Sequence, residues 1–319
     1  MIRPTLIAAI LAAILASPAL ALPAFAQDTR TFIDDAGRSV EIPAHPERIV
    51  SLHDLFFSVP LIELGILPIG SHGRSNDEGT EPFMRSSKMM TGVDFDTADI
   101  TFLGTGTEID PEAIAALEPD LIVLSTNQDP DLYASIAPAI LLDFSLSDKY
   151  ALYDRLAEIT GSQANLNLLK TRYEQQLSQL KTVVDTPSIS VNVIAAVDGQ
   201  VRSYRHFAAL GRVLDDAGFA MPEVVRDVPS GQYQDYSPEM LPEMDADLIL
   251  VTYRAEQGET AQDAYDQLEA AVPGFCAFLT ACQNGRLIAI PRDETFVTSY
   301  NALGTLAYSM IALTTPPAR

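Results

Sequence analysis

The sequence has 319 residues, of which 20 are Lys or Arg and 43 are Asp or Glu, and its formal net charge is −23 at pH 7. A charge so negative argues against binding to nucleic acid or to anionic lipid surfaces, although a local cluster of arginines can oppose the overall sign. With 47% hydrophobic residues the chain is globular, and it is long enough for two lobes with cores of their own.

Residues 1–26 have the pattern of a secretory signal peptide. Arg3 precedes an apolar run over residues 6–22, and Ala24-Phe25-Ala26 supplies the small-x-small pattern that signal peptidase reads. The run is short for a bilayer span, so an N-terminal membrane anchor is the weaker interpretation. No cysteine lies near the expected cleavage site. We therefore expect an exported protein without a lipid anchor, in an oxidising compartment.

Strands and helices are expected to alternate in the first half of the mature chain. The pattern predicts a hairpin over residues 31–43, a strand over 48–52, a helix over 55–64, a strand from 67, a helix from 110 and a strand over 121–124. Residues 73–103 show little periodicity, and a loop of that length is usually functional or mobile. The alternation is typical of parallel α/β architecture, in which ligand-contacting loops follow the carboxyl ends of strands.

A long helical pattern separates this half from the second. Apolar residues recur at helical intervals from about residue 147 to 184, with Gly161 as the expected break. The second half repeats the alternation, with strands over 189–197, 248–252 and 287–290 and helices over 211–217 and about 302–313. A long helix in this position can act as a stiff strut between two α/β halves.

Cys276 and Cys282 are the two cysteines of the chain. In an oxidising compartment, two cysteines so close in sequence favour a local disulfide. The alternative is a pair of buried thiols. A metal site needs more ligands than this pair offers, and no His follows at zinc-finger spacing.

Three motifs occur in order along the mature chain: Asp35-Ala36-Gly37-Arg38 through residues 42–43 and then 46–52, residues 107–114 with 117–122, and Tyr236-Ser237-Pro238-Glu239 through residue 241 with residues 247–249. Together they resemble the periplasmic substrate-binding proteins of iron-siderophore and cobalamin ABC importers, the class with one rigid linking helix. The match extends from about residue 31 to 315.

The resemblance implies two α/β lobes joined by one long helix, with a ligand cleft between the lobes. Residues 27–147 would form the N-terminal lobe, 148–185 the linking helix and 186–319 the C-terminal lobe. The resemblance further implies a monomeric, non-enzymatic periplasmic protein without an intrinsic cofactor, which hands its ligand to an ABC permease dimer at the inner membrane.

One glutamate in each lobe would dock on arginines of that permease. Glu108 and Glu239 are the positions that match the family motif. The alternative is an ordinary acid at a helix start, which the helix dipole favours by a few tenths of a kcal/mol. For Glu112 we prefer this second interpretation.

The expected ligand is a ferric siderophore, whose site needs fixed cations and aromatic or apolar walls. Arginine suits such a site better than lysine because its charge is permanent and its planar guanidinium stacks on rings. The candidate ligand-binding residues lie where cleft loops are expected, and they are His72, Arg74, Tyr204, Arg205, His206, Tyr233, Tyr253, Arg254 and Tyr300. Arg205 and Arg254 match positions where several relatives carry a ligand-contacting arginine, although a lone arginine near a strand end is more often part of a surface ion pair.

Several other functions stay open at this stage. Cobalamin or haem would suit the same fold, whereas a zinc or manganese carrier needs three or four converging ligands and the chain has no His-rich loop. A secreted hydrolase is disfavoured because the G-x-S-x-G and H-E-x-x-H motifs are absent and Ser178-x-x-Lys181 falls within the linking helix without partner motifs. Among siderophores, the sequence does not choose between catecholate, hydroxamate and citrate types.

Overall fold

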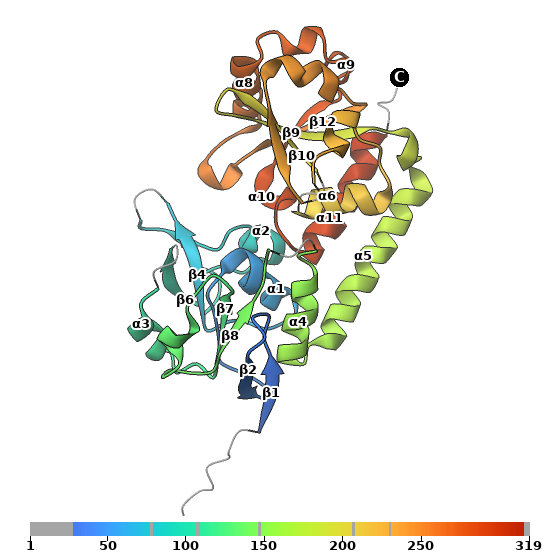
Figure 1. Ribbon diagram of the computed structural model, residues 1–319. Helices are drawn as coiled ribbons and strands as arrows, with labels where there is room; N and C mark the ends of the chain where they lie inside the picture. The colour runs from blue at the N-terminus through green and yellow to red at the C-terminus, as the bar shows by residue number, and fades with distance from the viewer. Residues whose placement is uncertain are drawn as a thin grey trace, which may run out of the picture.

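The computed structural model describes residues 28–76, 79–105, 109–145, 148–205, 208–229 and 231–315. Two α/β lobes lie one above the other, and a long helix, α5, runs along one side of both (Figure 1). This is the predicted fold class. The expected signal peptide, Glu108 and His206 lie outside the described residues.

The N-terminal lobe is built on a mostly parallel sheet with the strand order β5-β4-β3-β7-β8, to which β6 adds by pairing with β4. β5 is antiparallel to β4, and the other pairs are parallel. β3 and β7 are buried throughout, as expected for strands covered on both faces. The strands are β3 (Ile49–Ser51), β4 (Gly70–Ser75), β5 (Pro82–Phe83), β6 (Thr101–Thr105), β7 (Leu121–Ser125) and β8 (Ala139–Leu142).

Short helices and an N-terminal hairpin complete this lobe. The hairpin of β1 (Thr29–Ile33) and β2 (Ser39–Pro43) is antiparallel, as predicted. The helical segments are η1 (Asp54–Ser58), α1 (Val59–Glu63), α2 (Ser87–Thr91), α3 (Pro111–Ala115) and η2 (Pro130–Tyr133). The stretch 73–103, predicted as a loop, contains β5 and α2, which are too short to produce a periodic pattern in the sequence.

The C-terminal lobe has a second sheet with the order β11-β10-β9-β12-β13. β9, β12 and β13 are parallel, and β10 and β11 extend the sheet in antiparallel fashion. The strands are β9 (Val191–Val197), β10 (Gln200–Tyr204), β11 (Tyr233–Tyr236), β12 (Leu248–Tyr253) and β13 (Leu287–Pro291). The helical segments are η3 (Thr186–Ser188), α6 (Ala208–Ala217), α7 (Glu223–Arg226), η4 (Pro238–Met244), η5 (Ala255–Gln257), α8 (Ala261–Ala271), η6 (Phe275–Ala277), α9 (Thr280–Gln283), α10 (Arg292–Thr295) and α11 (Tyr300–Thr314).

Two consecutive helices connect the lobes. α4 (Ala151–Thr160) ends at Gly161, which adopts a left-handed φ of 70°, and α5 (Gln163–Val183) follows. The predicted break at Gly161 is therefore confirmed. At 1.5 Å per residue, the 21 residues of α5 span about 31 Å. The domain boundaries proposed from the sequence stay a prediction.

The junction between the lobes is held by α11, which returns from the C-terminal lobe and packs along α5 (Figure 1). Glu63, at the end of α1, accepts hydrogen bonds from the Tyr153 and Ser299 hydroxyls and from the backbone N–H groups of Tyr300 and Asn301 at 2.8 and 3.1 Å. Burial raises the pKa of Glu63, and these hydrogen bonds partly offset that rise. A carboxylate of one lobe thus caps a helix of the other inside a shared core.

The predicted disulfide between Cys276 and Cys282 is present and joins η6 to α9 in the C-terminal lobe. Among the described residues, we find no helix that is long and apolar enough to cross a membrane.

Candidate ligand-binding cleft

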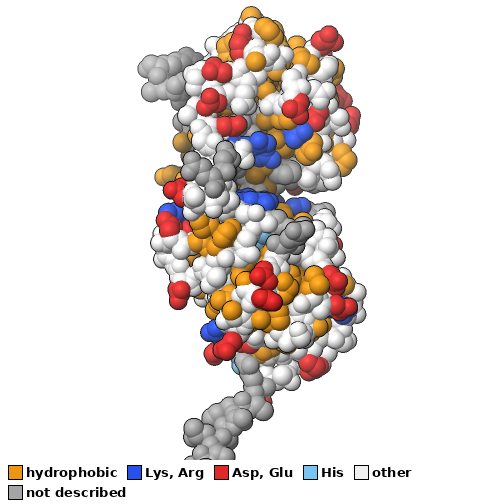
Figure 2. All heavy atoms as spheres, turned by 90° about the vertical axis from the view of Figure 1, so that its left-hand side faces the viewer, with side chains coloured by type: hydrophobic (Ala, Val, Ile, Leu, Met, Phe, Trp, Pro, Cys, Tyr) orange, Lys and Arg blue, Asp and Glu red, His pale blue; other side chains and the backbone are white. Residues whose placement is uncertain are grey.

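A cleft of about 1280 Å³ lies between the lobes. Many of the residues that line this cleft lie where strands end. Arg74 lies near the carboxyl end of β4, Arg254 follows β12, and Arg292 follows β13. Because parallel strands end at one edge of a sheet, each lobe presents these side chains at the edge that faces the other lobe. Figure 2 shows Lys and Arg side chains on both sides of the line where the lobes meet.

The charged residues of the cleft come from both lobes. Its cations are Arg74, Arg85, Lys149, Arg212, Arg254 and Arg292, and its acids are Asp148, Asp215, Asp216, Glu256 and Asp293. The apolar part of the wall includes Leu55 and the aromatic rings of Phe56, Phe83, Tyr150 and Phe296.

Asp54, in the N-terminal lobe, holds the cleft residue Arg85 in place. Its side chain is fully buried, and its carboxylate accepts hydrogen bonds from Nε of Arg85 at 2.9 Å and from the Arg85 backbone N–H at 3.1 Å. Nδ1 of His72 lies 3.4 Å from the same carboxylate. Burial acts to raise the pKa of Asp54, but the bonds from Arg85 and His72 hold it far below its usual value. Asp54 is therefore ionised and fixes the position of Arg85.

His53 and His72 stack on each other next to Asp54, with ring centroids 5.9 Å apart. Burial lowers the pKa of His53 to about 3, so this side chain is neutral at neutral pH. Nδ1 of His53 accepts a hydrogen bond from the backbone N–H of Phe56 at the start of η1. His53 thus has a structural role in shaping this wall.

A second group of charges is formed by α6 and the residues just before α4. Nε of Arg212 donates to Asp216 at 2.7 Å, and its NH1 group lies 3.2 Å from Asp148. Lys149 lies over the ring of Phe56, with its ammonium 6.0 Å from the ring centroid. The Arg212 charge is therefore compensated by protein carboxylates.

Ser86 connects the lobes across the cleft. Its backbone N–H donates to the carboxylate of Glu256, and its hydroxyl donates to the backbone oxygen of Asp293 at 2.5 Å. The Glu256 backbone N–H donates to Oδ2 of Asp293 at 3.0 Å. Desolvation raises the pKa of Glu256 to about 7, and the nearby carboxylates of Asp293 and Asp54 add to this, whereas the bond from Ser86 opposes it. Glu256 therefore titrates near neutral pH within the cleft.

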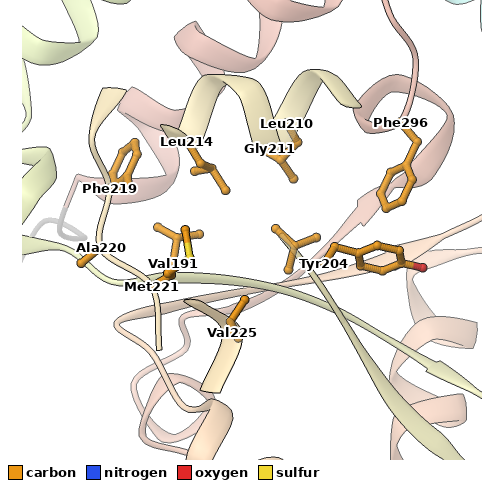
Figure 3. A pocket seen from close by; sticks show the side chains of 11 residues that line it. Val191, Tyr204, Leu210, Gly211, Leu214, Phe219, Ala220, Met221, Val225 and Phe296 are labelled. Carbon is orange, nitrogen blue, oxygen red and sulfur yellow. The ribbon is translucent and has the colours of Figure 1, made fainter. Parts of the chain in front are cut away.

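A small apolar cavity of about 20 Å³ lies behind the cleft, within the C-terminal lobe. Figure 3 shows Phe296 and Tyr204 at one end of it and Phe219, Leu214 and Val191 toward the other. Phe296 borders both this cavity and the cleft. A volume this small holds about one water molecule, so the cavity belongs to the packing of the lobe.

The structure places the predicted ligand-binding residues in different surroundings. Arg74 and Arg254 line the cleft. Tyr204 is buried with its ring against Phe296, and His72 is buried behind the cleft wall. The NH1 group of Arg205 donates to the backbone oxygens of Arg226 and Val228, as a structural arginine does.

The remaining predicted tyrosines do not line the cleft as the structure describes it. Tyr233 is 46% exposed and stacks with Arg202, whose guanidinium lies 3.8 Å from the ring centroid. Tyr253 packs at the edge of the C-terminal core, and Tyr300 is buried against Tyr150 and Tyr153.

Sequence reasoning missed Arg85 and Arg292. Arg85 lies in the segment 73–103, for which the sequence predicts a long loop that is functional or mobile, and Arg292 directly follows the strand β13. The rule that selected Arg74 and Arg254 applies equally to Arg292, which begins α10 immediately after β13. Arg85 carries no such signal, because a distant aspartate positions it.

The sequence matches the family described as periplasmic binding protein over residues 82–294. A Bacillus subtilis relative named probable siderophore-binding lipoprotein YfiY is 28% identical over 72% of this chain and 71% of its own. The Fe(3+)-citrate-binding protein YfmC of the same organism is 24% identical over 84% of this chain and 80% of its own. Among solved structures, the FhuD protein from S. pseudintermedius superposes with a TM-score of 0.69 at 18% identity, covering 91% of this chain and 99% of that one.

Proposed function

The chain belongs to the periplasmic binding protein family, in the class that serves siderophore and cobalamin importers, and from that premise we propose that it binds a ferric siderophore in the interlobe cleft and delivers it to an ABC permease. Members of this class are binding proteins rather than enzymes and need no resident cofactor. Two relatives whose names specify siderophore or ferric citrate binding support the ligand class.

The cleft is the observation that carries this proposal. Its volume of about 1280 Å³ exceeds the roughly 300–1,000 Å³ of ordinary ligand sites and suits a bulky iron complex. Arginines from both lobes and the rings of Phe56, Phe83 and Phe296 line it. Guanidinium groups and aromatic faces are the partners that the anionic and planar groups of many siderophores require.

A zinc or manganese ligand has less support. Within the described ranges, no three His, Cys, Asp or Glu side chains are close enough together to hold a metal ion. Four histidines occur in the whole sequence, and His53 and His72 are engaged with Asp54 and its surroundings. Cobalamin and haem remain alternative ligands of the same cleft.

Delivery through the periplasm is part of the proposal. Residues 1–26 would direct export, and the mature protein would diffuse as a monomer without a lipid anchor, in contrast to the Bacillus relative that is named a lipoprotein. Glu239 is exposed at the start of η4, a position open to a partner protein. We assign it, together with Glu108, to contact with a permease dimer.

The ligand proposal is tested by titrating the mature chain with iron complexes. The protein contains 11 tyrosines and no tryptophan, so intrinsic tyrosine fluorescence reports binding. We expect saturable quenching by a submicromolar ferric siderophore and none by zinc, manganese or the iron-free siderophore. Saturable quenching by zinc without any response to ferric complexes would overturn the proposal.

A further inference from the structure

We propose that the ligand is a ferric complex with net negative charge, carried by carboxylate or catecholate oxygens, and that Arg74, Arg254 and Arg292 select it. This inference rests on the cleft being the ligand site proposed above. It adds the charge of the ligand and the residues that recognise it.

The first observation is that the charge of the cleft differs from that of the chain. Six of the 20 Lys and Arg residues line the cleft, whereas five of the 43 Asp and Glu residues do so. On the face shown in Figure 2, acidic side chains are spread over the outer parts of both lobes, while basic ones gather near the line between them. A strongly acidic protein thus concentrates cations in its cleft, where low-dielectric walls strengthen their field.

The second observation is that the protein neutralises some of these cations and not others. Arg85 is paired with Asp54, and Arg212 with Asp148 and Asp216. For Arg74, Arg254 and Arg292, no carboxylate among the described residues lies within 4.0 Å of the guanidinium. Their charges are available to a ligand.

Other arginines lie close to Arg74 and Arg292, and their positive charges repel one another. Partial burial and the nearby Arg85 lower the pKa of Arg74. Burial lowers the pKa of Arg292, and the charges of Arg254 and Arg202 add to this, while Tyr204 and Asp293 oppose it. Asp54 and Asp293 compensate these charges only in part, so the remaining repulsion between like charges costs free energy that a bound anion reduces.

Their placement would fix an anion between the lobes. Arg74 belongs to β4 in the N-terminal lobe, and Arg254 and Arg292 belong to the C-terminal lobe. The Arg292 guanidinium lies 4.5 Å from the ring centroid of Phe296 and 5.9 Å from that of Tyr204. Stacking on two rings holds this charge in one place, so less conformational entropy is lost when it binds an anion.

Two acids in the same region oppose this field without cancelling it. Asp293 is engaged by the backbone of Glu256, and Glu256 by the backbone of Ser86. Since the pKa of Glu256 is raised to about 7, a substantial fraction of this carboxyl is neutral at neutral pH. The three arginines therefore keep a positive excess.

The test compares ferric citrate, a ferric tris-catecholate and a neutral ferric trihydroxamate in the same titration, at 50 and 500 mM NaCl. We expect one or both anionic complexes to bind at least about tenfold more tightly than the neutral one, and high salt to weaken that binding. The citrate and catecholate arms distinguish the two anionic chemistries. Arg74→Gln, Arg254→Gln and Arg292→Gln should each weaken the anionic complex about tenfold or more, as expected for the loss of a charged hydrogen-bond donor.

Arg172→Gln is the matched control, because Arg172 is exposed on α5, outside the cleft, and its removal changes the net charge by the same amount. It should leave every affinity within twofold. Circular dichroism melting of each variant verifies that the fold is retained. Tight, salt-independent binding of the neutral complex, unaffected by the three substitutions, would overturn this inference and leave the proposed function standing. Failure of all three ferric complexes to bind would overturn both.

Discussion

Exchange of Glu256 for Gln should remove a pH dependence of ligand binding. Glu256 lines the cleft, and burial raises its pKa to about 7, with Asp293 and Asp54 adding to the effect. A carboxylate in this position repels an anionic ligand, whereas the protonated form does not. Binding of an anion therefore favours the protonated state, and affinity should fall as the pH rises through 7.

The size of the effect follows from the titration of one group. With a pKa of about 7, Glu256 is roughly nine-tenths protonated at pH 6 and one-tenth at pH 8. If only the protonated form binds, the dissociation constant rises about tenfold between these two pH values, and about half a proton is taken up per ligand at pH 7. Tenfold is the upper limit, because some binding to the ionised form reduces it.

The assay is the fluorescence titration at pH 6, 7 and 8, with an anionic ferric complex and both proteins. The amide that Glu256→Gln introduces keeps an acceptor for the Ser86 N–H, so the contact between the lobes is preserved. Changes in the ligand's own protonation affect wild type and variant equally and cancel in their ratio. Glu243→Gln, at an exposed position of η4 outside the cleft, is the control for the loss of one negative charge. Identical pH profiles for wild type and Glu256→Gln would refute the reasoning.

Three further predictions concern stability and transport. Glu63→Ala should lower the free energy of unfolding, measured in urea, by about 3 kcal/mol or more, because it leaves buried donors of α11 and Tyr153 without their acceptor. Glu63→Gln should cost less. Equal urea midpoints for wild type and the Ala variant would contradict this prediction. Replacing Cys276 and Cys282 together by Ser should cost about 2 kcal/mol, as expected for a disulfide that closes so short a loop, and an unchanged urea midpoint would count against it. Glu239→Arg should leave the ligand affinity in solution within twofold of wild type but reduce cellular uptake of the ligand at least tenfold. Glu243, also exposed on η4, provides the control. If Glu243→Arg reduces uptake as much, Glu239 has no special docking role.

The parts of the fold that could be predicted are those whose sequence has a periodic apolar pattern or a glycine that marks a turn or the end of a helix. The hairpin, the strand at 121–124, the long helical segment and its break at Gly161 all carry such signals, and the structure contains each of them. The segment 73–103 was predicted as a loop because β5 has two residues and α2 has five. Elements of that length are fixed by contacts distant in sequence, such as the bonds from the Arg85 backbone to Asp54 and from the Ser86 backbone to Glu256, rather than by their own pattern.

The candidate site was predictable to the extent that it follows strand ends. Arg74 and Arg254 were found by that rule, and Arg292 obeys it too. Arg205 follows β10, which runs antiparallel to β9, so the rule for parallel strands does not place it at the cleft edge. Its side chain turns to the backbone of residues 226 and 228, which no local pattern reveals. Arg85 depends on Asp54, which lies 31 positions away in sequence, so only the folded chain brings them together.

The two ways in which the lobes meet indicate where ligand exchange takes place. At the junction, α5, α11 and the buried Glu63 belong to one apolar core, and separating them would expose that core to water. At the cleft, the lobes are joined through the hydrogen bonds that Ser86 makes to Glu256 and Asp293. The bond to the Asp293 backbone is worth about 1 kcal/mol net, and the bond to the Glu256 carboxylate about 1.5–3 kcal/mol. Opening on the cleft side is therefore much cheaper than bending at the junction. The carboxyl that titrates near pH 7 takes part in this weaker contact, so the same group that repels an anionic ligand also helps to hold the lobes together around it.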